Sequence, residues 1–429
     1  MRTDTIFALA TARGKAGVAI VRISGPEAWA ALGKLVGKIP EPRLASVRRI
    51  SDGRGGLIDE ALVLVFAQGH SFTGEESAEI HLHGGPAIAR AVFQELSEIQ
   101  GLRVAEPGEF TRRALENDRL DVAQVEGLSD LIEAETETQR VQALRVFQGE
   151  LAHQVGEWRK KLVRSLALVE ATIDFADEEI PDGLFEEVAA LVDEAVSTLK
   201  SHVSGANFSE RVRNGFEVAI LGPPNAGKST LLNRLANREA AITSEIAGTT
   251  RDIVEVGMDL AGLPVTFLDT AGLRETSDVI ESIGIRRALE RAETADLRII
   301  LSVDGERPTG VTAREFDIVV TAKADLGGQG DWAVSGKTGT GISELLAEIT
   351  RRLESRNSGS IFIRDRHVQA AETALACLLT ARSRLEGQEP AEIIAENLRQ
   401  ALRALDSLVG RVDVEDVLDE IFASFCLGK

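Results

Sequence analysis

The chain has 429 residues, 44% of them hydrophobic, which is enough for two or three domains with cores of their own. Its 48 Lys and Arg against 68 Asp and Glu give a net charge of -20, which argues against a broad surface that coats nucleic acid. Two cysteines exclude a disulfide framework, and no apolar run is long enough to cross a membrane. We therefore expect a cytoplasmic protein without a membrane span.

The first stretch, residues 1–118, mixes short strands with helices. Apolar runs at 18–23 and 61–66 are typical of strands, and the patterns at 86–98 and 111–116 are helical. This mixture predicts a compact α+β domain.

Residues 119–213 and 357–429 are helix-periodic, and the stretch 214–356 between them alternates strands with helices. The predicted strands of that stretch are 217–221, 265–269, 297–303, 316–321 and 332–334, and its predicted helices are 229–237, 283–291 and 342–353. The helices predicted after it are 366–385, 391–406 and 413–424. The pattern predicts a Ras-like α/β domain, with a doubly wound parallel sheet, inserted into a helical domain.

The most informative motif follows the first of these strands. Residues 222–229 read Gly-Pro-Pro-Asn-Ala-Gly-Lys-Ser and lead into an apolar helical pattern. Strand, glycine-rich loop and helix together predict a phosphate-binding loop, whose backbone N–H groups and Lys228 contact phosphates while Ser229 binds Mg²⁺. A later strand ends in Asp269 of an Asp-Thr-Ala-Gly motif, and Thr250 lies between them as a second Mg²⁺ ligand.

Base selection is expected from residues 322–325, which read Ala-Lys-Ala-Asp. Asp325 would accept hydrogen bonds from the N1–H and 2-amino groups of guanine, and Lys323 would cover the base. Ala322 stands where such motifs carry Asn, so we expect GTP affinity to be lower by roughly 1 kcal/mol. Predicted GTP contacts are Asn225, Ala226, Gly227, Lys228, Ser229, Thr230, Ser244, Glu245, Ile246, Ala247, Gly248, Thr249, Thr250, Asp269, Thr270, Ala271, Gly272, Lys323, Asp325, Ser335, Gly336 and Lys337.

The residue after Asp-Thr-Ala-Gly is Leu273, which cannot orient an attacking water as glutamine does in Ras-like enzymes. Arg274, Glu275 and Glu281 are the candidates that the residues themselves leave open for this role.

The sequence resembles the MnmE (TrmE) family of bacterial tRNA-modification GTPases over essentially its whole length. The resemblance rests on residues 222–229, 248–252 and 269–274, and on the terminal Phe-Cys-Leu-Gly-Lys at 425–429. The N-terminal half adds the segments 18–26, 72–75 (Phe-Thr-Gly-Glu), 83–85 (His-Gly-Gly), 107–111 (Pro-Gly-Glu-Phe-Thr) and 120–124 (Leu-Asp-Val-Ala-Gln).

The resemblance implies a tetrahydrofolate-binding and dimerising domain at 1–118, a helical domain at 119–213 and 357–429, and a G domain at 214–356. It further implies a homodimer that joins an FAD-dependent partner of the MnmG (GidA) type in a heterotetramer. Together they would add an aminomethyl or carboxymethylaminomethyl group to C5 of the wobble uridine, position 34, of certain tRNAs, with the one-carbon unit from 5-formyl- or methylene-tetrahydrofolate.

Residue roles also follow from the resemblance. K⁺ would replace an arginine finger in dimerised G domains, and its ligands would be Asn225, Ser244, Ile246 and Thr249. Glu281 would orient the attacking water and Arg274 would stabilise the switch. The residues that match the folate site are Arg22, Glu79, Arg119 and Lys429.

The residues give independent support for Glu79. Glu79, His81 and His83 alternate with two apolar residues, so on a strand they share one polar face. That face fits the polar edge of a pterin, but a solvated face and, with a third ligand, a metal site at the two histidines stay open as alternatives.

Two other functions stay open at this stage. One is a GTP-driven switch in ribosome maturation, which predicts an attached basic RNA-binding module that the sequence does not show. The other is a folate-binding module with a degenerate G domain, which only Ala322 supports.

Overall fold

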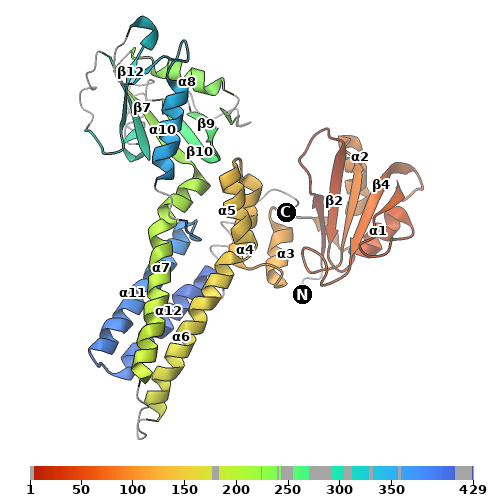
Figure 1. Cartoon of the computed structure of the whole chain (residues 1–429). Helices are drawn as coiled ribbons and strands as arrows, with labels where there is room; N and C mark the ends of the chain where they lie inside the picture. The colour runs from red at the N-terminus through yellow and green to blue at the C-terminus, as the bar shows by residue number, and fades with distance from the viewer. Residues whose placement is uncertain are drawn as a thin grey trace, which may run out of the picture. The chain divides into compact units, whose positions relative to one another are not determined.

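The structure is a computed structural model, shown in Figure 1. It describes residues 4–175, 183–223, 225–238, 241–242, 255–269, 291–303, 312–327, 332–355, 359–410 and 428. Contacts divide the chain into two compact units, which we describe separately. The first unit comprises residues 1–129, 147–155 and 406–429, and the second comprises 130–146 and 156–405.

The first unit contains a six-stranded sheet in the order β3-β4-β5-β2-β1-β6. Its strands are β1 (Thr5–Leu9), β2 (Val18–Ser24), β3 (Ser46–Ser51), β4 (Leu57–Phe66), β5 (Ser77–His83) and β6 (Leu102–Val104). Neighbours are antiparallel except β1 and β6, which are parallel.

The two faces of this sheet bury different residues because side chains alternate along a strand. Phe7 of β1 packs in the core that α1 (Ala28–Val36) and α2 (Pro86–Ser97) form on one face. Its neighbours Ile6 and Ala8 contact Phe110 of α3 (Glu109–Glu116) instead. The helix α4 (Val122–Glu133) follows α3.

The predicted α+β organisation of this part is confirmed. The predicted elements at 18–23, 61–66, 86–98 and 111–116 correspond to β2, β4, α2 and α3. Sequence analysis did not identify α1, β3 or β6. The reason is clear for β3, which lies at the sheet edge, carries two arginines and buries only Ile50, so it has little apolar signal.

Helices form one part of the second unit. They are α5 (Glu137–Phe147), α6 (Glu150–Asp174), α7 (Leu184–Asn214), α11 (Asp365–Glu386) and α12 (Ala391–Leu408). Figure 1 shows α6, α7, α11 and α12 running alongside one another. The buried Trp158 of α6 donates its Nε1–H to Thr198 Oγ1 of α7 at 2.8 Å, so the largest core side chain also satisfies its polar atom.

The other part of the second unit is a seven-stranded sheet in the order β13-β12-β11-β7-β10-β9-β8. Its strands are β7 (Phe216–Leu221), β8 (Ala241–Ile242), β9 (Glu255–Leu260), β10 (Leu263–Asp269), β11 (Leu297–Ser302), β12 (Ile318–Ala322) and β13 (Ala333–Val334). The five strands from β13 to β10 are parallel, whereas β9 is antiparallel to both of its neighbours. The helices α8 (Lys228–Ala236) and α10 (Ile342–Glu354) belong to the same fold.

The predicted doubly wound α/β fold is therefore confirmed, because the first strand β7 lies between later strands on both sides. The antiparallel β8 and β9 were not predicted. They are joined to the parallel part by a two-residue turn in which Ala261 and Gly262 have φ of 53° and 93°, and such mirror-image turns fit the twist of a hairpin.

Some predicted features lie outside the described residues, namely the helix at 413–424 and all of the helix at 283–291 except Arg291. The domain boundaries at 118, 213 and 356 stay predictions. Within the described ranges, no helix is both long and apolar enough to cross a membrane.

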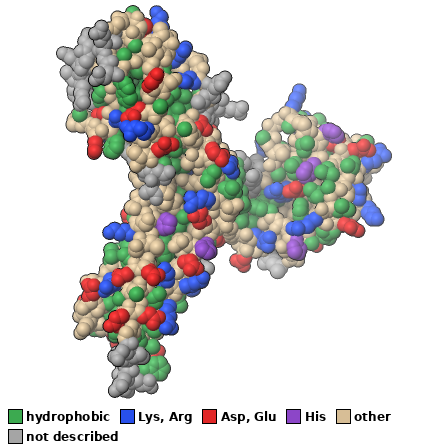
Figure 2. All heavy atoms as spheres, in the orientation of Figure 1, with side chains coloured by type: hydrophobic (Ala, Val, Ile, Leu, Met, Phe, Trp, Pro, Cys, Tyr) green, Lys and Arg blue, Asp and Glu red, His purple; other side chains and the backbone are tan. Residues whose placement is uncertain are grey.

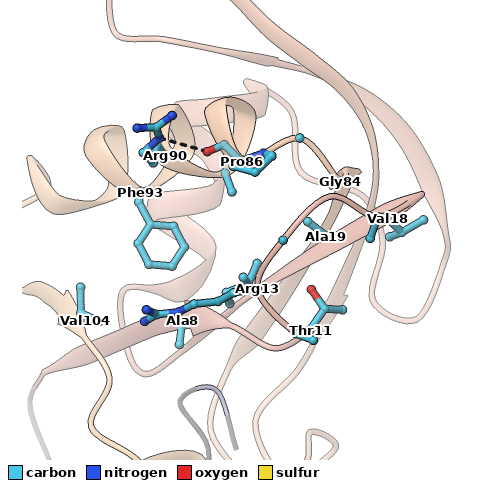
Figure 3. Close-up of a pocket in the computed structure, with 16 residues that line it drawn as sticks. Ala8, Thr11, Arg13, Val18, Ala19, Gly84, Pro86, Arg90, Phe93 and Val104 are labelled. Atoms are coloured by element: carbon cyan, nitrogen blue, oxygen red, sulfur yellow. Dashed lines mark hydrogen bonds between the residues drawn. The ribbon is translucent and has the colours of Figure 1, made fainter. Parts of the chain in front are cut away.

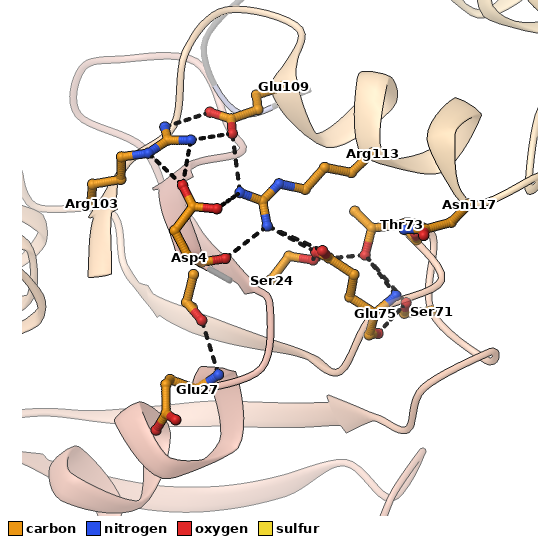
Figure 4. A network of polar contacts seen from close by, with 11 residues as sticks. Asp4, Ser24, Glu27, Ser71, Thr73, Glu75, Arg103, Glu109, Arg113 and Asn117 are labelled. Carbon is orange, nitrogen blue, oxygen red and sulfur yellow. Dashed lines mark hydrogen bonds and ion pairs between the residues drawn. The ribbon is translucent and has the colours of Figure 1, made fainter. Parts of the chain in front are cut away.

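A buried charged network holds the first unit together at the sheet edge near β1 (Figure 4). The side chain of Arg113 is 1% exposed and that of Glu109 is 2% exposed, and Arg113 Nη2 donates to Glu109 Oε1 at 3.1 Å. Arg113 also donates to the Asp4 carbonyl oxygen at 3.0 Å and to Glu75 Oε1 at 3.1 Å. Arg103 Nη1 donates to Glu109 Oε2 at 2.7 Å. The network thus joins β6, α3 and two loops.

The charge of Glu109 depends on these partners. Burial alone would raise the pKa of Glu109, but hydrogen bonds from Arg103, from the backbone N–H of Glu106 and from Arg113 outweigh it and lower the pKa to about 2. Because the pKa of the folded state lies below the ordinary value of 4.5, the network stabilises the fold above that pH and loses its contribution as the pH falls toward 2.

We predict that Glu109→Gln lowers the free energy of unfolding by about 3 kcal/mol at pH 7, because the buried guanidinium of Arg113 loses the most deeply buried of its carboxylate partners. The difference from wild type should shrink below pH 4.5 and disappear near pH 2. Scanning calorimetry across this pH range measures it, with the exposed Glu60→Gln as the control. A difference that is independent of pH would contradict the assignment.

Candidate functional site

The loop between β7 and α8 has the backbone of an anion-binding site. A Cβ at Gly222 would lie 2.9 Å from the carbonyl oxygen of Leu301, so the neighbouring strand leaves space only for glycine. Asn225 and Gly227 have φ of 61° and 99°. Alternation of left-handed and other residues turns successive N–H groups toward one concave side, where phosphate oxygens bind.

Lys228, the first residue of α8, is 8% exposed. Its Nζ donates to the carbonyl oxygens of Gly222 and Pro223 at 2.8 and 3.2 Å, so the amine closes the loop on itself. Burial lowers the pKa of Lys228, and the charge of Asp269 opposes this shift. The amine is held by carbonyl groups that a phosphate of a bound nucleotide would replace as its partners.

Asp269 reaches the same place from the neighbouring strand. It is the last residue of β10, lies beside Ile220 of the parallel strand β7, and is 6% exposed. Because parallel strands end at the same edge of a sheet, the carboxylate comes close to the loop, as its electrostatic interaction with Lys228 shows. Ser229 follows Lys228 in the first turn of α8.

A cavity of about 270 Å³ lies next to the loop. It is lined by residues from four separate segments of the chain: Asn225, Ala226, Gly227, Thr230 and Leu231; Leu301; Ala322, Lys323, Asp325 and Leu326; and Val334, Ser335, Gly336 and Lys337. The structure therefore brings together the loop and both segments predicted to contact the base.

Asp325 is oriented by its neighbour in the cavity. Ser335 Oγ donates to Asp325 Oδ1 at 2.7 Å, and this hydrogen bond lowers the pKa of Asp325. The segment that carries Ser335 packs tightly on α8, since a Cβ at Gly336 would lie 2.7 Å from the backbone nitrogen of Leu231. Ala322 is buried at the end of β12 and offers no polar atom of its side chain to the cavity.

Sequence reasoning missed the apolar residues of this cavity, among them Leu231, Leu301 and Val334. Leu301 and Val334 lie in strands β11 and β13, so only the strand order could have pointed to them. The predicted contacts that lie outside the described residues are Ser244, Glu245, Ile246, Ala247, Gly248, Thr249, Thr250, Thr270, Ala271 and Gly272, together with Arg274 and Glu281.

The polar face predicted in the N-terminal part is present on β5. Glu79 lies opposite Arg22 of β2, and Arg22 Nε donates to Glu79 Oε1 at 3.0 Å. The guanidinium of Arg22 also lies 5.7 Å from the ring centres of Phe72 and Phe110, as in cation–π contacts. His81 Nε2 is 3.4 Å from Glu79 Oε2.

The other predicted residues of this face differ in their surroundings. His83 Nδ1 lies 2.7 Å from Asp59 Oδ1, whereas His81 lies beside Glu79. Arg119 is exposed, and its side chain runs beside Gly74. Lys429 lies outside the described residues. Among the described side chains, no group of three or more His, Cys, Asp and Glu is placed to hold a metal ion, so the alternative of a histidine metal site gains no support.

The first unit contains a cavity of about 560 Å³ on the α2 side of its sheet (Figure 3). Its lining is mainly apolar, and Figure 3 shows Phe93 and Arg13 on facing sides of it. Val18 and Val104 contribute exposed apolar surface. Apolar surface of this kind is typical of an interface.

Two family profiles match the chain. One, described as the GTP-binding protein TrmE N-terminus, covers residues 5–119, and the other, the MnmE helical domain, covers residues 122–426. The tRNA modification GTPase MnmE of Cereibacter sphaeroides (strain ATCC 17029 / ATH 2.4.9) is 56% identical to the chain over 428 residues, 99% of this chain and 100% of that protein. This chain belongs to the MnmE family. The MnmE protein of Dinoroseobacter shibae is 57% identical with the same coverage.

Membership of the MnmE family of tRNA modification GTPases agrees with the nucleotide-site geometry of the second unit, and it favours this function over a switch in ribosome maturation. Among solved structures, the G domain of the T. maritima FeoB iron transporter is 22% identical and covers 32% of this chain and 97% of that chain, at a TM-score of 0.23. At that score the likeness carries no further argument.

We predict that Asp325→Asn weakens GTP binding by roughly 10- to 100-fold, because the guanine N–H donors lose a charged acceptor. The variant should gain affinity for XTP, whose 2-oxo group can accept from the new amide. Equilibrium titration with labelled nucleotides measures both, with the exposed Glu344→Gln of α10 as control. Unchanged preference for GTP would show that Asp325 does not read the base.

Proposed function

We propose that the chain is a K⁺-activated GTPase that forms a homodimer and acts with an FAD-dependent partner of the MnmG (GidA) type. The product would be an aminomethyl or carboxymethylaminomethyl group on C5 of uridine 34 of certain tRNAs, with the one-carbon unit from a tetrahydrofolate derivative. The observation that carries the GTPase part is the cavity in which Asp325 and Ser335 lie beside the loop of Lys228.

The loop between β7 and α8 carries oxygen atoms that suit Mg²⁺ and K⁺ as ligands. Ser229 and Asn225 are exposed at the loop, so their side-chain oxygens are accessible to hard cations. We propose Ser229 and Thr250 as Mg²⁺ ligands. For K⁺ we propose Asn225, Ser244, Ile246 and Thr249. A monovalent cation among these oxygens would neutralise charge that develops on the phosphates during hydrolysis.

Water activation needs a polar group, since Leu273 provides none. We propose that Glu281 orients the attacking water and that Arg274 stabilises the switch segment. Lys228 holds the phosphates, and its amine already lies against the loop carbonyls. Asp269 comes from the neighbouring strand to complete the polar side of the site.

For the folate we propose the face of β5 with Arg22, Glu79, Arg119 and Lys429. Glu79 is held by Arg22, and its carboxylate can still accept hydrogen bonds from the donors of a pterin. His81 Nε2 is buried without a hydrogen-bond partner among the described residues, so the face contains a polar atom that a ligand could satisfy. The basic residues suit the glutamate tail.

For the assembly we propose that a second copy of the chain contacts the apolar cavity lined by Val18, Phe93 and Val104, because exposed apolar surface there is typical of an interface. The net charge of -20 favours a basic partner for much of the tRNA contact, in a cytoplasmic heterotetramer.

We predict that GTP hydrolysis depends on K⁺ and falls at least ten-fold when Na⁺ replaces it, because the smaller ion does not match the same oxygens. ATP should not be hydrolysed under either condition.

We also predict that Glu281→Ala abolishes turnover and leaves nucleotide affinity within about two-fold. Steady-state phosphate release and nucleotide titration measure these quantities, and equal rates in K⁺ and Na⁺ would refute the cation mechanism.

We predict that 5-formyl-tetrahydrofolate raises the melting temperature of the wild type but not of Arg22→Ala, since this variant loses the cation that positions Glu79. The exposed Arg49→Ala of β3 is the matched control and should respond like the wild type. Thermal shift assays measure the change in melting temperature on adding the folate. Identical changes in the wild type and Arg22→Ala would reject the folate site.

A further inference from the structure

The chain crosses between the helices and the nucleotide-binding sheet of the second unit at two places. It passes into the sheet where α7 ends at Asn214, after which Gly215, with φ of 91°, turns the chain into β7. It returns through residues 359–364, between α10 and α11. These two crossings are the covalent connections between the nucleotide-binding sheet and the helices.

One carboxylate accepts hydrogen bonds from an arginine at each crossing. Asp130, in the last turn of α4, accepts a hydrogen bond at Oδ1 from Arg213 Nε at 2.8 Å. The same Oδ1 accepts a second hydrogen bond from Arg364 Nη2 at 2.7 Å. Arg213 is the residue before the end of α7, and Arg364 is the residue before α11. We call Asp130, Arg213 and Arg364 the crossing cluster.

Neighbouring contacts connect the crossings directly. Ser360 donates its backbone N–H to Ser209 Oγ at 3.2 Å, and Ser209 Oγ donates to the Ser360 carbonyl oxygen at 3.1 Å. On the sheet side, Arg211 pairs with the buried Asp296 at 2.9 Å. Asp296 Oδ2 in turn accepts from the backbone N–H of Glu217 in β7, also at 2.9 Å. The last turn of α7 thus contacts Asp130 through Arg213 and the nucleotide-binding strand through Arg211.

The crossing cluster has a second arrangement open to it. Asp130 Oδ2 is buried and has no hydrogen-bond partner among the described residues, although two cations share the other oxygen. Beside Asp130 and Arg213 lies a polar cavity of about 250 Å³, which is also lined by Gln142 and Asn214. The cavity leaves room for the guanidinium of Arg213 to change position, and Oδ2 is an acceptor that an arginine can take after such a shift.

We infer that Asp130 is a positioning residue that transmits the nucleotide state to the helices by exchanging its arginine partners between the two carboxylate oxygens. Two arginines on one oxygen are coupled, because a shift of one changes the hydrogen bond of the other. A shift of β7 when nucleotide binds reaches Arg213 through the last turn of α7 and then Arg364 through Asp130. The inference rests on the proposed GTPase function and extends it to how the nucleotide state of the G domain reaches the helices.

Hydrogen exchange of the full-length chain, without nucleotide and with GDP, aluminium fluoride and K⁺, tests the inference. Two segments are followed: residues 222–231, which report nucleotide binding, and residues 359–364, whose amides of Ser360 and Phe362 are hydrogen-bonded to serine hydroxyls. In the wild type, nucleotide should change exchange in both segments by at least three-fold. In Asp130→Asn the first segment should respond as in the wild type, and the response of the second should fall below about 1.5-fold.

Matched variants separate coupling from mere stability. Asp193→Asn removes an exposed ion pair between α7 and α11, to Arg382 at 2.9 Å, and should keep both responses. Asp130→Glu keeps the charge and should restore part of the second response. Arg364→Gln leaves the Asp130–Arg213 pair in place and tests the same link if Asp130→Asn does not fold. In the double variant of Asp130→Asn with Arg364→Gln, the exchange response of residues 359–364 should fall no further than in either single variant.

The outcomes are distinguishable. If residues 222–231 respond in the wild type but residues 359–364 do not, or if Asp130→Asn and Arg364→Gln keep the full response at 359–364, the inference is overturned. If residues 222–231 do not respond in the wild type, it is the proposed nucleotide site that fails.

Discussion

Main-chain hydrogen bonds between β7 and its two parallel neighbours, β10 and β11, hold the nucleotide site together. The register that pairs Asp269 with Ile220 and Ile300 with Leu221 sets where each strand ends. Parallel strands must end at the same edge, so the loop of Lys228, the carboxylate of Asp269 and the wall formed by Leu301 converge there. A one-residue slip would turn these side chains to the wrong face of the sheet.

The same register explains the glycines of the site. Gly222 faces the carbonyl oxygen of Leu301, and Gly336 faces the backbone of α8. Both approaches are too close for a side chain, so glycine is required by the neighbouring segment and not by the local chain alone. The loop and the base cavity are consequently parts of one packed arrangement, in which Ser335 can hold Asp325 in place.

Charged groups inside the protein perform two different tasks. In the first unit, Arg113 and Glu109 are buried with several partners each, and the arrangement fixes the sheet edge and the start of α3. In the second unit, Asp130 serves two arginines with one oxygen and leaves the other unused. Several partners on each charged group favour a single structure, whereas two arginines on one carboxylate oxygen permit an exchange of partners.

Elements with local signals could be predicted from the residues alone. Neighbouring residues predict three such features: the glycine loop before α8, the end of β10 at Asp269, and the alternation along β5. Phosphate loops and strand faces depend on spacings of one to eight positions, so a short stretch of sequence reveals them. The motif of 322–325 pointed to Asp325 for the same reason. Edge strand β3 was missed because Ile50 is its one buried residue and its apolar signal is weak. Strand β9 was also missed, although Val256, Met258 and Leu260 alternate with less buried residues as in other strands.

The contacts between distant residues, in contrast, depend on how the whole chain packs. Nothing in the spacing of Asp130, Arg213 and Arg364 indicates that they share one oxygen atom. Nothing local places Leu301 against Gly222, or Arg113 against Asp4 and Glu75. These contacts arise from strand order and helix packing, which are set by the burial of apolar faces over the whole chain. Local spacing specifies which chemical groups each segment carries. Packing over the whole chain specifies which of these segments come together in one site.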